Sequence, residues 1–127
     1  LGTTGTFVGA SRRLKELAPS ISCISMEPDS PLHGLEGLKH LATAMVPGIY
    51  DATLADERLT VSTEEAYEMT RMLAREEGLY VGVSSGAAMV AALAVASRLR
   101  SGVIVTVFPD GGTRYGSDRF WNEAEDK

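Results

Sequence analysis

The apolar and polar residues of this chain recur first at helical and then at strand-like spacing, so the pattern predicts alternating helices and strands. Helical spacing between Phe7 and Ala18 predicts a first helix, and Pro19 ends it. A second helix follows Ser62 or Thr63, either of which can cap it, and Gly78 stops it. The core-facing residues expected on these two helices are Phe7, Leu14, Leu17 and Ala18, and then Ala66, Met69, Thr70 and Leu73.

Three short apolar runs predict strands. Ile21–Met26 is bounded by Glu27-Pro28, a predicted chain break, and Leu59–Val61 precedes the second helix. Val103–Phe108 is continuously apolar, as are strands buried inside parallel sheets. Between the last two runs, Ala87–Leu99 predicts a helix that is apolar on nearly every face and therefore buried.

This order of elements predicts an α/β fold, with an open, mostly parallel sheet and helices on both faces. Residues 32–58 lack sustained periodicity and are expected to form an ordered, functional loop. Glycine-rich turns occur at residues 2–6, 82–86 and 110–112, each after an expected strand. Because ligands of open α/β sheets bind beyond the carboxyl ends of the strands, the three turns are expected to converge on one crevice.

Charge and composition exclude several classes of function. The formal net charge is −5, which argues against nucleic acid or an anionic membrane as a main partner. The single Cys23, expected to be a buried small hydrophobe in mid-strand, forms no internal disulfide and fits a reducing, cytoplasmic compartment. The apolar run at residues 81–99 is interrupted by polar residues and glycine, so no membrane span is predicted. His33 and His40 lack partners at ligand spacing, so no metal site is predicted.

The first residues of the chain form the most informative turn. Glycines give such a loop a backbone that can approach an anion closely, and the helix that follows directs N–H groups and its positive dipole end toward it. The expected ligand is a phosphate; the alternative is an ordinary glycine-rich turn with threonine caps. Leu1 is interpreted as the end of a strand, and the chain as the C-terminal part of a longer protein. The residues of this turn are Gly2, Thr3, Thr4, Gly5 and Thr6.

Four motifs in register resemble the cysteine synthase family, which includes O-acetylserine sulfhydrylase, and one further stretch is most similar to its cysteine synthase B branch. The motifs are Gly2–Thr6, Glu27-Pro28, Gly82-Val-Ser-Ser-Gly-Ala-Ala88 and Pro109-Asp-Gly-Gly-x-Arg-Tyr115, and the further stretch is Val46–Tyr50. The resemblance implies a fold type II enzyme dependent on pyridoxal 5'-phosphate (PLP). It spans essentially residues 1–127, which would be the C-terminal, large-domain part of such an enzyme.

The resemblance also implies roles for single residues. Residues 2–6 would hold the cofactor phosphate, and Ser84 would hydrogen-bond the pyridine nitrogen, where a neutral hydroxyl favours β-elimination and replacement over transamination. Ser84 could instead, or also, cap the helix at Ala87. Gly48 would lie beside the cofactor or simply form a turn after Pro47. Asp110 would lie near the pyridine side of the pocket or simply form a turn.

The Schiff-base lysine of the family lies in its N-terminal half, and none of Lys15, Lys39 and Lys127 occurs in a matching context. Lys15 is expected to face outward on the first helix. No catalytic residue is therefore assigned to this chain, and the chain alone is expected to be inactive.

Two hypotheses follow. In the first, the chain is part of a dimeric, cytoplasmic transferase that makes L-cysteine from an activated serine (O-acetyl- or O-phosphoserine) and a sulfur donor, with an N-terminal half supplying the lysine. In the second, it is a non-catalytic α/β module or fragment that binds a phosphate-bearing ligand.

Overall fold

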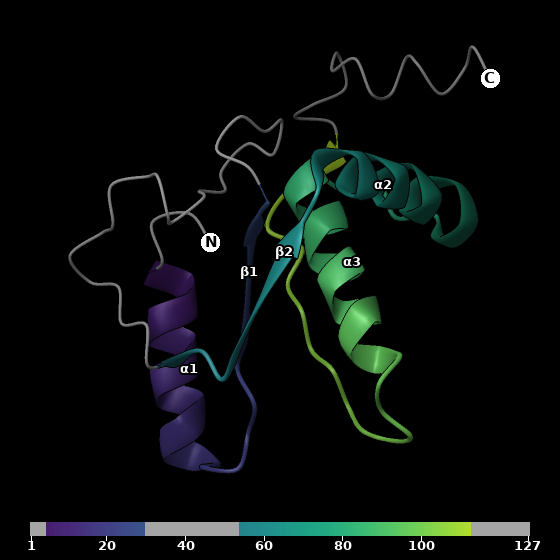
Figure 1. The fold of residues 1–127 in the computed structure, drawn as a ribbon. Coiled ribbons are helices and arrows are strands. Elements are labelled where there is room, and N and C mark those ends of the chain that lie inside the picture. The colour runs from purple at the N-terminus through teal and green to yellow at the C-terminus, as the bar shows by residue number, and fades with distance from the viewer. Residues whose placement is uncertain (1–4, 30–53, 113–127) are drawn as a thin grey trace.

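The computed structural model describes residues 5–29 and 54–112 of the chain (Figure 1). These residues contain three helices and two strands, in the order helix, strand, strand, helix, helix. They are α1 (Gly5–Leu17), β1 (Ile24–Pro28), β2 (Glu57–Val61), α2 (Thr63–Glu77) and α3 (Val83–Ala96).

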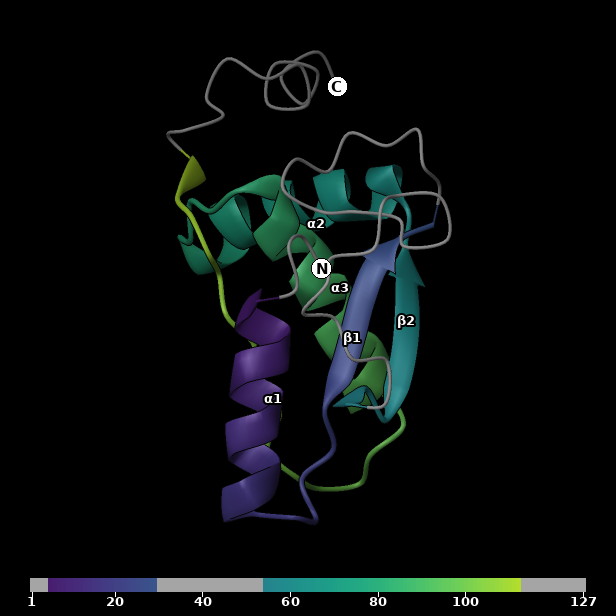
Figure 2. The same cartoon turned by 90° about the vertical axis from the view of Figure 1, so that its left-hand side faces the viewer.

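The strands β1 and β2 form a parallel sheet, in register from Ile24 opposite Glu57 to Pro28 opposite Val61. In Figure 1, α1 lies on one side of the strands, and α2 and α3 lie on the other. Figure 2 views the strands from the α1 side, with α2 and α3 behind them. The predicted α/β class, with a parallel sheet and helices on both faces, is confirmed.

The strand β1 begins and ends later than the sequence predicted. Glu27 and Pro28, expected to break the strand, are its last two residues. Proline is tolerated at this position because the missing N–H falls at the end of the ladder, and the following residue, Asp29, donates its N–H to Val61 O at 3.1 Å. Cys23 therefore lies just before the strand rather than within it, but it is buried and free, as expected.

The helix α2 follows its sequence signals closely. Ser62 is the N-cap and forms a capping box with Glu65, whose N–H donates to Ser62 Oγ at 3.1 Å. At the other end, Gly78 adopts a left-handed φ of 67° and donates its N–H to Leu73 O. Three of the four predicted core residues, Ala66, Thr70 and Leu73, are buried, and Met69 is half-buried.

The helix α3 begins at Val83, four residues before the predicted start, and its N-cap is Gly82. The prediction of burial on nearly every face is wrong for this helix. Its buried residues lie toward its N-terminal end and pack against α2 and the strands, whereas Leu93 is 49% exposed. The core cluster consists of Val61, Ala66, Val83, Ala87 and Ala91. No helix in residues 5–29 and 54–112 has the length and apolar character needed to cross a membrane.

The buried side of α1 differs from the predicted stripe. Val8 and Ser11 are buried, whereas Leu14 is 43% and Leu17 65% exposed. Lys15, expected to face outward, reaches the residue before β2 instead. Val8, Ser11 and Lys15 thus face the rest of the described chain, whereas Leu17 lies mostly in solvent.

The third predicted strand, residues 103–108, does not form in the described part of the chain. The segment runs back along α3 as an irregular trace (Figure 1), and Val103 and Val105 are 91% and 84% exposed. Its apolar composition is suited to a buried parallel strand, but a strand also needs a neighbour, and no described strand pairs with this segment.

The contact between α2 and α3 depends on the absence of a side chain at Gly86. A Cβ atom there would lie 2.6 Å from the carbonyl oxygen of Ala66 and would also collide with the Thr70 hydroxyl. That hydroxyl is buried and already donates to the same carbonyl at 2.6 Å. Neither neighbour can move without opening the α2–α3 pair, whose contact is the most extensive between any two of the described elements.

We therefore expect Gly86→Ala to lower the free energy of unfolding by about 2 kcal/mol, the usual cost of overpacking a core. Gly9→Ala is the matched control, because a Cβ at Gly9 in α1 meets nothing within 4 Å and alanine favours a helix by about 0.5–1 kcal/mol. Urea unfolding of both variants measures the difference. Equal stability of the two variants would contradict the packing argument.

Asp56 joins α1 to the start of the sheet. Its carboxylate accepts a hydrogen bond from Lys15 Nζ at 2.8 Å and another from the Cys23 N–H at 2.7 Å. The Lys15 hydrogen bond and then the Cys23 hydrogen bond lower the pKa of Asp56 below its ordinary value of 3.8. A pKa lowered on folding means that the ionised carboxylate stabilises the fold above pH 3.8, and that this contribution disappears as the pH falls through the lower, folded-state pKa.

Asp56→Asn should accordingly lower the urea midpoint at neutral pH, and the gap from the unmodified chain should narrow as the pH falls below 3.8. Glu16→Gln removes a charge from an exposed i,i+3 pair with Arg13 and serves as the control with little effect. A gap for Asp56→Asn that stays constant across this pH range would rule out ionisation as its cause.

Candidate functional site

Two of the three predicted turns meet in the structure. Residues 80–82 lie beside residues 110–112, so the segment before α3 is paired with the turn that follows residues 103–108. The contacts are an antiparallel bridge of Val81 with Gly111, a hydrogen bond from the Gly82 N–H to Asp110 O at 3.2 Å, and one from the Gly112 N–H to Tyr80 O at 2.9 Å. These two turns therefore meet, as predicted, and the crevice expected beside them stays a prediction.

Gly112 is required by the closeness of this pairing. A Cβ atom at Gly112 would lie 2.6 Å from two ring atoms of Tyr80, so the buried glycine allows the aromatic ring to lie directly against the backbone. The ring and the paired backbone together hold the two turns in a fixed arrangement at the N-terminal end of α3.

Ser84 lies in the first turn of α3 and is half-buried. The alternative interpretation of Ser84 as the helix cap is wrong, because the N-cap is Gly82 and no side chain caps this helix. Within the described part of the chain, no hydrogen bond of the Ser84 hydroxyl is found. The hydroxyl is thus available to a ligand near the positive end of the α3 dipole.

Ser85 is a polar residue of this region to which the sequence analysis assigned no role. It is fully buried, and its Oγ has no hydrogen-bond partner among the described residues. Buried hydroxyls are nearly always satisfied in folded proteins, so an orphaned one marks a place where a polar group is expected. The sequence signal for Ser85 was the pair of consecutive serines, Ser84 and Ser85. A helix N-cap uses one side-chain hydroxyl, so the second serine had no capping role to explain it.

Asp110 is positioned by the turn pairing itself. Its backbone carbonyl accepts from Gly82, and its carboxylate atom Oδ1 is buried. Asp110 lies in a bend, as the turn interpretation predicts, and that bend is paired with the segment leading into α3. The two interpretations of Asp110 are therefore compatible.

The predicted phosphate loop is only partly within the described residues. Gly5 and Thr6 are the first two residues of α1, so the helix begins inside the predicted loop. Gly2, Thr3, Thr4 and Gly48 lie outside the described residues, and their assignments stay predictions.

The three helix N-termini differ in a way that bears on anion binding. The first turn of α2 carries Glu64 and Glu65 and is closed by its capping box. The first turns of α1 and α3 contain no acidic residue. Acidic residues near a helix N-terminus compete with an anionic ligand for the positive dipole end, and α1 and α3, unlike α2, have no such residue in the first turn.

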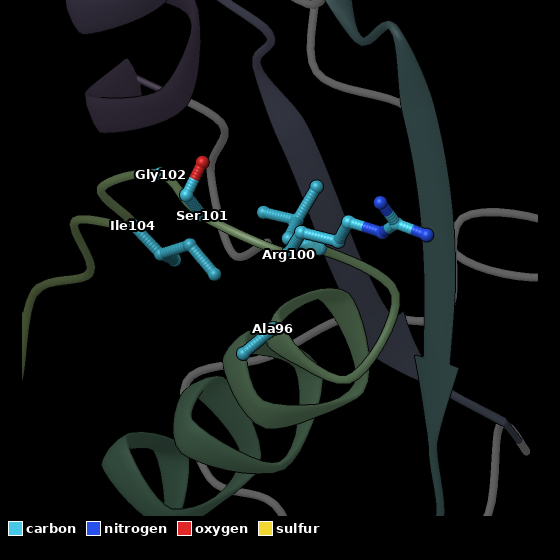
Figure 3. A pocket seen from close by; sticks show the side chains of 6 residues that line it. Ala96, Arg100, Ser101, Gly102 and Ile104 are labelled. Carbon is cyan, nitrogen blue, oxygen red and sulfur yellow. The ribbon is translucent and has the colours of Figure 1, made fainter.

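The described residues also contain a hollow of about 210 Å³ at the C-terminal end of α3 (Figure 3). Ser84 lies at the opposite end of this helix. The lining residues of the hollow are Ala96, Leu99, Arg100, Ser101, Gly102 and Ile104. None of the predicted site residues lines it. A search of residues 5–29 and 54–112 finds no group of three or more metal-ligating side chains, and His33 and His40 lie outside these ranges.

Comparison with known proteins identifies the class. The chain belongs to the pyridoxal-phosphate dependent enzymes, whose family model matches residues 1–110. It is 48% identical over 119 residues to the cysteine synthase of Aquifex aeolicus, covering 91% of this chain and 36% of the relative. It is 36% identical over 123 residues to cysteine synthase B of Escherichia coli, covering 97% of this chain and 40% of the relative. The resemblance found in the sequence motifs is thereby confirmed.

Solved structures agree with the sequence relatives. A cysteine synthase from Entamoeba histolytica matches with a TM-score of 0.89 at 31% identity, covering 96% of this chain and 38% of that one. An O-acetylserine dependent cystathionine β-synthase from Helicobacter pylori matches with a TM-score of 0.81 at 41% identity, covering 95% and 42%. The chain thus spans well under half the length of the relatives it matches.

The residues around α3 fit pyridoxal 5'-phosphate, the cofactor of this family. The site offers a neutral hydroxyl at Ser84, an orphaned buried hydroxyl at Ser85 and a helix N-terminus without acidic residues. Such neutral donors suit a heteroaromatic ring whose nitrogen accepts a hydrogen bond.

Proposed function

We propose that the chain is the C-terminal part of a PLP-dependent transferase that forms L-cysteine from an activated serine and a sulfur donor by β-replacement. The observation that carries the proposal is the pairing of residues 80–82 with residues 110–112 at the N-terminus of α3. This pairing fixes Ser84 and Asp110 on adjoining turns, with the Ser84 hydroxyl not used as a helix cap. The cysteine synthases among the relatives support the choice of reaction.

In this proposal Ser84 donates its hydroxyl hydrogen to the pyridine nitrogen of the cofactor. Bound PLP supplies an electron sink for bonds to the amino acid's α-carbon. A neutral donor, unlike a carboxylate, does not hold a proton on the ring nitrogen, so the sink is weaker. A neutral hydroxyl at Ser84 would therefore favour β-elimination and replacement over transamination.

The cofactor phosphate would be held at the N-terminus of α1. Gly2 to Thr4 would supply backbone N–H groups and hydroxyls, while Gly5 and Thr6 open the helix whose first turn carries no acidic residue. Gly48 would complete the wall beside the ring. The assignment of these residues rests on their motif and on the position of Gly5 and Thr6 at the start of the helix.

The lysine that carries the cofactor would come from an N-terminal half of the same enzyme. Lys15 is the one lysine among the described residues, and it forms an ion pair with Asp56. It lies on α1, on the opposite side of the strands from α3 (Figure 1). We therefore propose that residues 1–127 provide the phosphate and pyridine contacts but no Schiff-base lysine, and that the chain alone is inactive. A cytoplasmic homodimer would be the working form of the whole enzyme.

Borohydride reduction followed by denaturing intact-mass measurement tests where the cofactor is attached. We expect a PLP adduct on a polypeptide that contains the N-terminal half and no adduct on a species with the mass of this chain alone. An adduct on Lys15 of this chain would contradict the proposal that the N-terminal half supplies the Schiff-base lysine.

Ser84→Asp tests the pyridine contact in a preparation that includes the N-terminal half. A carboxylate would hold a proton on the ring nitrogen, so the absorbance spectrum of bound PLP should change and β-replacement should slow by about tenfold or more, at least about 1.4 kcal/mol of barrier. Ser20→Asp, which places the same charge on an exposed turn, is the control. An unchanged spectrum in Ser84→Asp would show that Ser84 does not contact the ring and would favour a non-catalytic phosphate-binding module.

A further inference from the structure

Ser85 carries a buried hydroxyl that the helix α3 does not use. The residue is 0% exposed, and its Oγ has no hydrogen-bond partner among the described residues. The buried hydroxyl of Thr70 on α2, by contrast, donates to Ala66 O at 2.6 Å. A buried hydroxyl without a partner destabilises the fold, because it has lost its hydrogen bonds to water and gained none in return. Ser85 thus places a destabilising hydroxyl in the helical turn that also carries Ser84.

The enclosure of this hydroxyl decides what kind of partner it can have. Protein atoms cover Ser85 Oγ, so a ligand cannot contact it directly, whereas the adjacent Ser84 is half-buried and can be reached. The partner of Ser85 must accordingly be a protein group that a change of side-chain rotamer or a small shift of the neighbouring turn brings within reach. Side chains in a helix lean toward its N-terminus, so Ser85 leans toward the paired turns before Val83.

The carboxylate of Asp110 is the acceptor that this arrangement offers. Its Oδ1 is buried, and two backbone hydrogen bonds connect its bend to the first turn of α3. The Ser85 N–H donates to Gly82 O at 3.1 Å, and the Gly82 N–H donates to Asp110 O at 3.2 Å. A carboxylate accepts several hydrogen bonds, and one from a hydroxyl is roughly twice as strong as a hydrogen bond between neutral groups. A hydrogen bond between the two side chains would therefore remove the cost of the Ser85 hydroxyl.

We infer that Ser85 is a positioning residue, whose hydroxyl donates to the Asp110 carboxylate when PLP is bound beside Ser84; the inference rests on the proposed function. The pairing of the two turns is an isolated bridge, so it can adjust by a small amount without unfolding a sheet. Ser84 and Ser85 are consecutive residues of one helical turn, so a ligand that orients Ser84 also restricts the backbone of Ser85. The hydrogen bond would lock the turn that leads into Ser84 to the bend that contains Asp110. A ligand that favours the locked arrangement gains affinity from that bond.

Amide exchange of the two N–H groups that join the turns tests this locking, in a preparation that includes the N-terminal half. These are the Gly82 N–H, which donates to Asp110 O, and the Gly112 N–H, which donates to Tyr80 O. We expect saturating PLP to slow the exchange of both groups by about tenfold or more. In Ser85→Ala, at a PLP concentration that also saturates the variant, we expect the exchange to slow by less than about threefold.

Two further measurements on the same preparation separate positioning from an ordinary packing role. Without PLP, Ser85→Ala should leave the urea midpoint unchanged or raise it, because the substitution removes a buried hydroxyl that has no partner. With PLP, it should raise the dissociation constant for PLP by about tenfold, because the charge-assisted hydrogen bond is lost. Ser85→Cys keeps a side chain of similar size with a weaker donor, so its dissociation constant should fall between those of Ser85→Ala and the unmodified protein.

A double variant tests the identity of the acceptor. Asp110→Ala should also weaken PLP binding, and adding Ser85→Ala to it should weaken binding no further, since both substitutions remove the same hydrogen bond. Ser97→Ala is the matched control, because Ser97 at the other end of α3 has an exposed hydroxyl that donates to Ala94 O at 2.7 Å. It should leave the dissociation constant for PLP unchanged.

The inference is overturned if PLP slows the two amides equally in Ser85→Ala and in the unmodified protein. It is also overturned if Ser85→Ala lowers the urea midpoint without PLP, or if the effects of Ser85→Ala and Asp110→Ala on PLP affinity simply add. Each of these outcomes leaves the proposed function standing when the preparation binds PLP and makes L-cysteine. A preparation that binds no PLP would instead contradict the proposed function, and this inference with it.

Discussion

The pairing of residues 80–82 with residues 110–112 is the constraint on which the rest of the described site depends. It is small, consisting of one antiparallel bridge and the hydrogen bonds beside it. Because it lies directly before Val83, it fixes where α3 begins, and because it lies directly after residues 103–108, it fixes where that segment ends. One contact therefore sets both the position of Ser84 and the path of the exposed apolar segment.

The helix that starts at this pairing is kept close to its neighbour by small residues. Gly86 lets α3 approach the backbone of α2 at Ala66, and Ala87 continues the contact without adding bulk. Small residues at a helix crossing allow a close approach, but they leave few side-chain atoms to cover the remaining faces.

Elements governed by local chemistry could be predicted from the sequence. The capping box at Ser62 and the left-handed Gly78 determine α2 within its own residues, and both ends were predicted correctly. The exposed side of α1 and the state of residues 103–108 depend instead on what packs against them, which periodicity does not reveal. The candidate site likewise combines features that the sequence predicts with features that depend on packing. Two glycine-rich turns meet as predicted, but they do so through an isolated antiparallel bridge and not at the ends of two strands of the sheet. The exclusion of Ser84 as a cap required the observed helix start, and Ser85 emerged only from its burial without a partner.

In the described part of the chain, small apolar residues are buried and several large apolar residues are exposed. Its buried apolar residues are mostly valine and alanine, with Leu73 the one buried leucine among the described residues. The leucines of α1 and α3, and the valines at positions 103, 105 and 107, are substantially exposed. Burial of a leucine or valine side chain is worth about 1.5–3 kcal/mol, so a chain that folded only for itself would leave much of its available stabilisation unused. The same side chains would contribute that stabilisation if a partner polypeptide covered them. Folding of this chain and covering of those side chains would then be coupled, because residues 103–107 lie between α3, which carries Ser84, and the bend that contains Asp110.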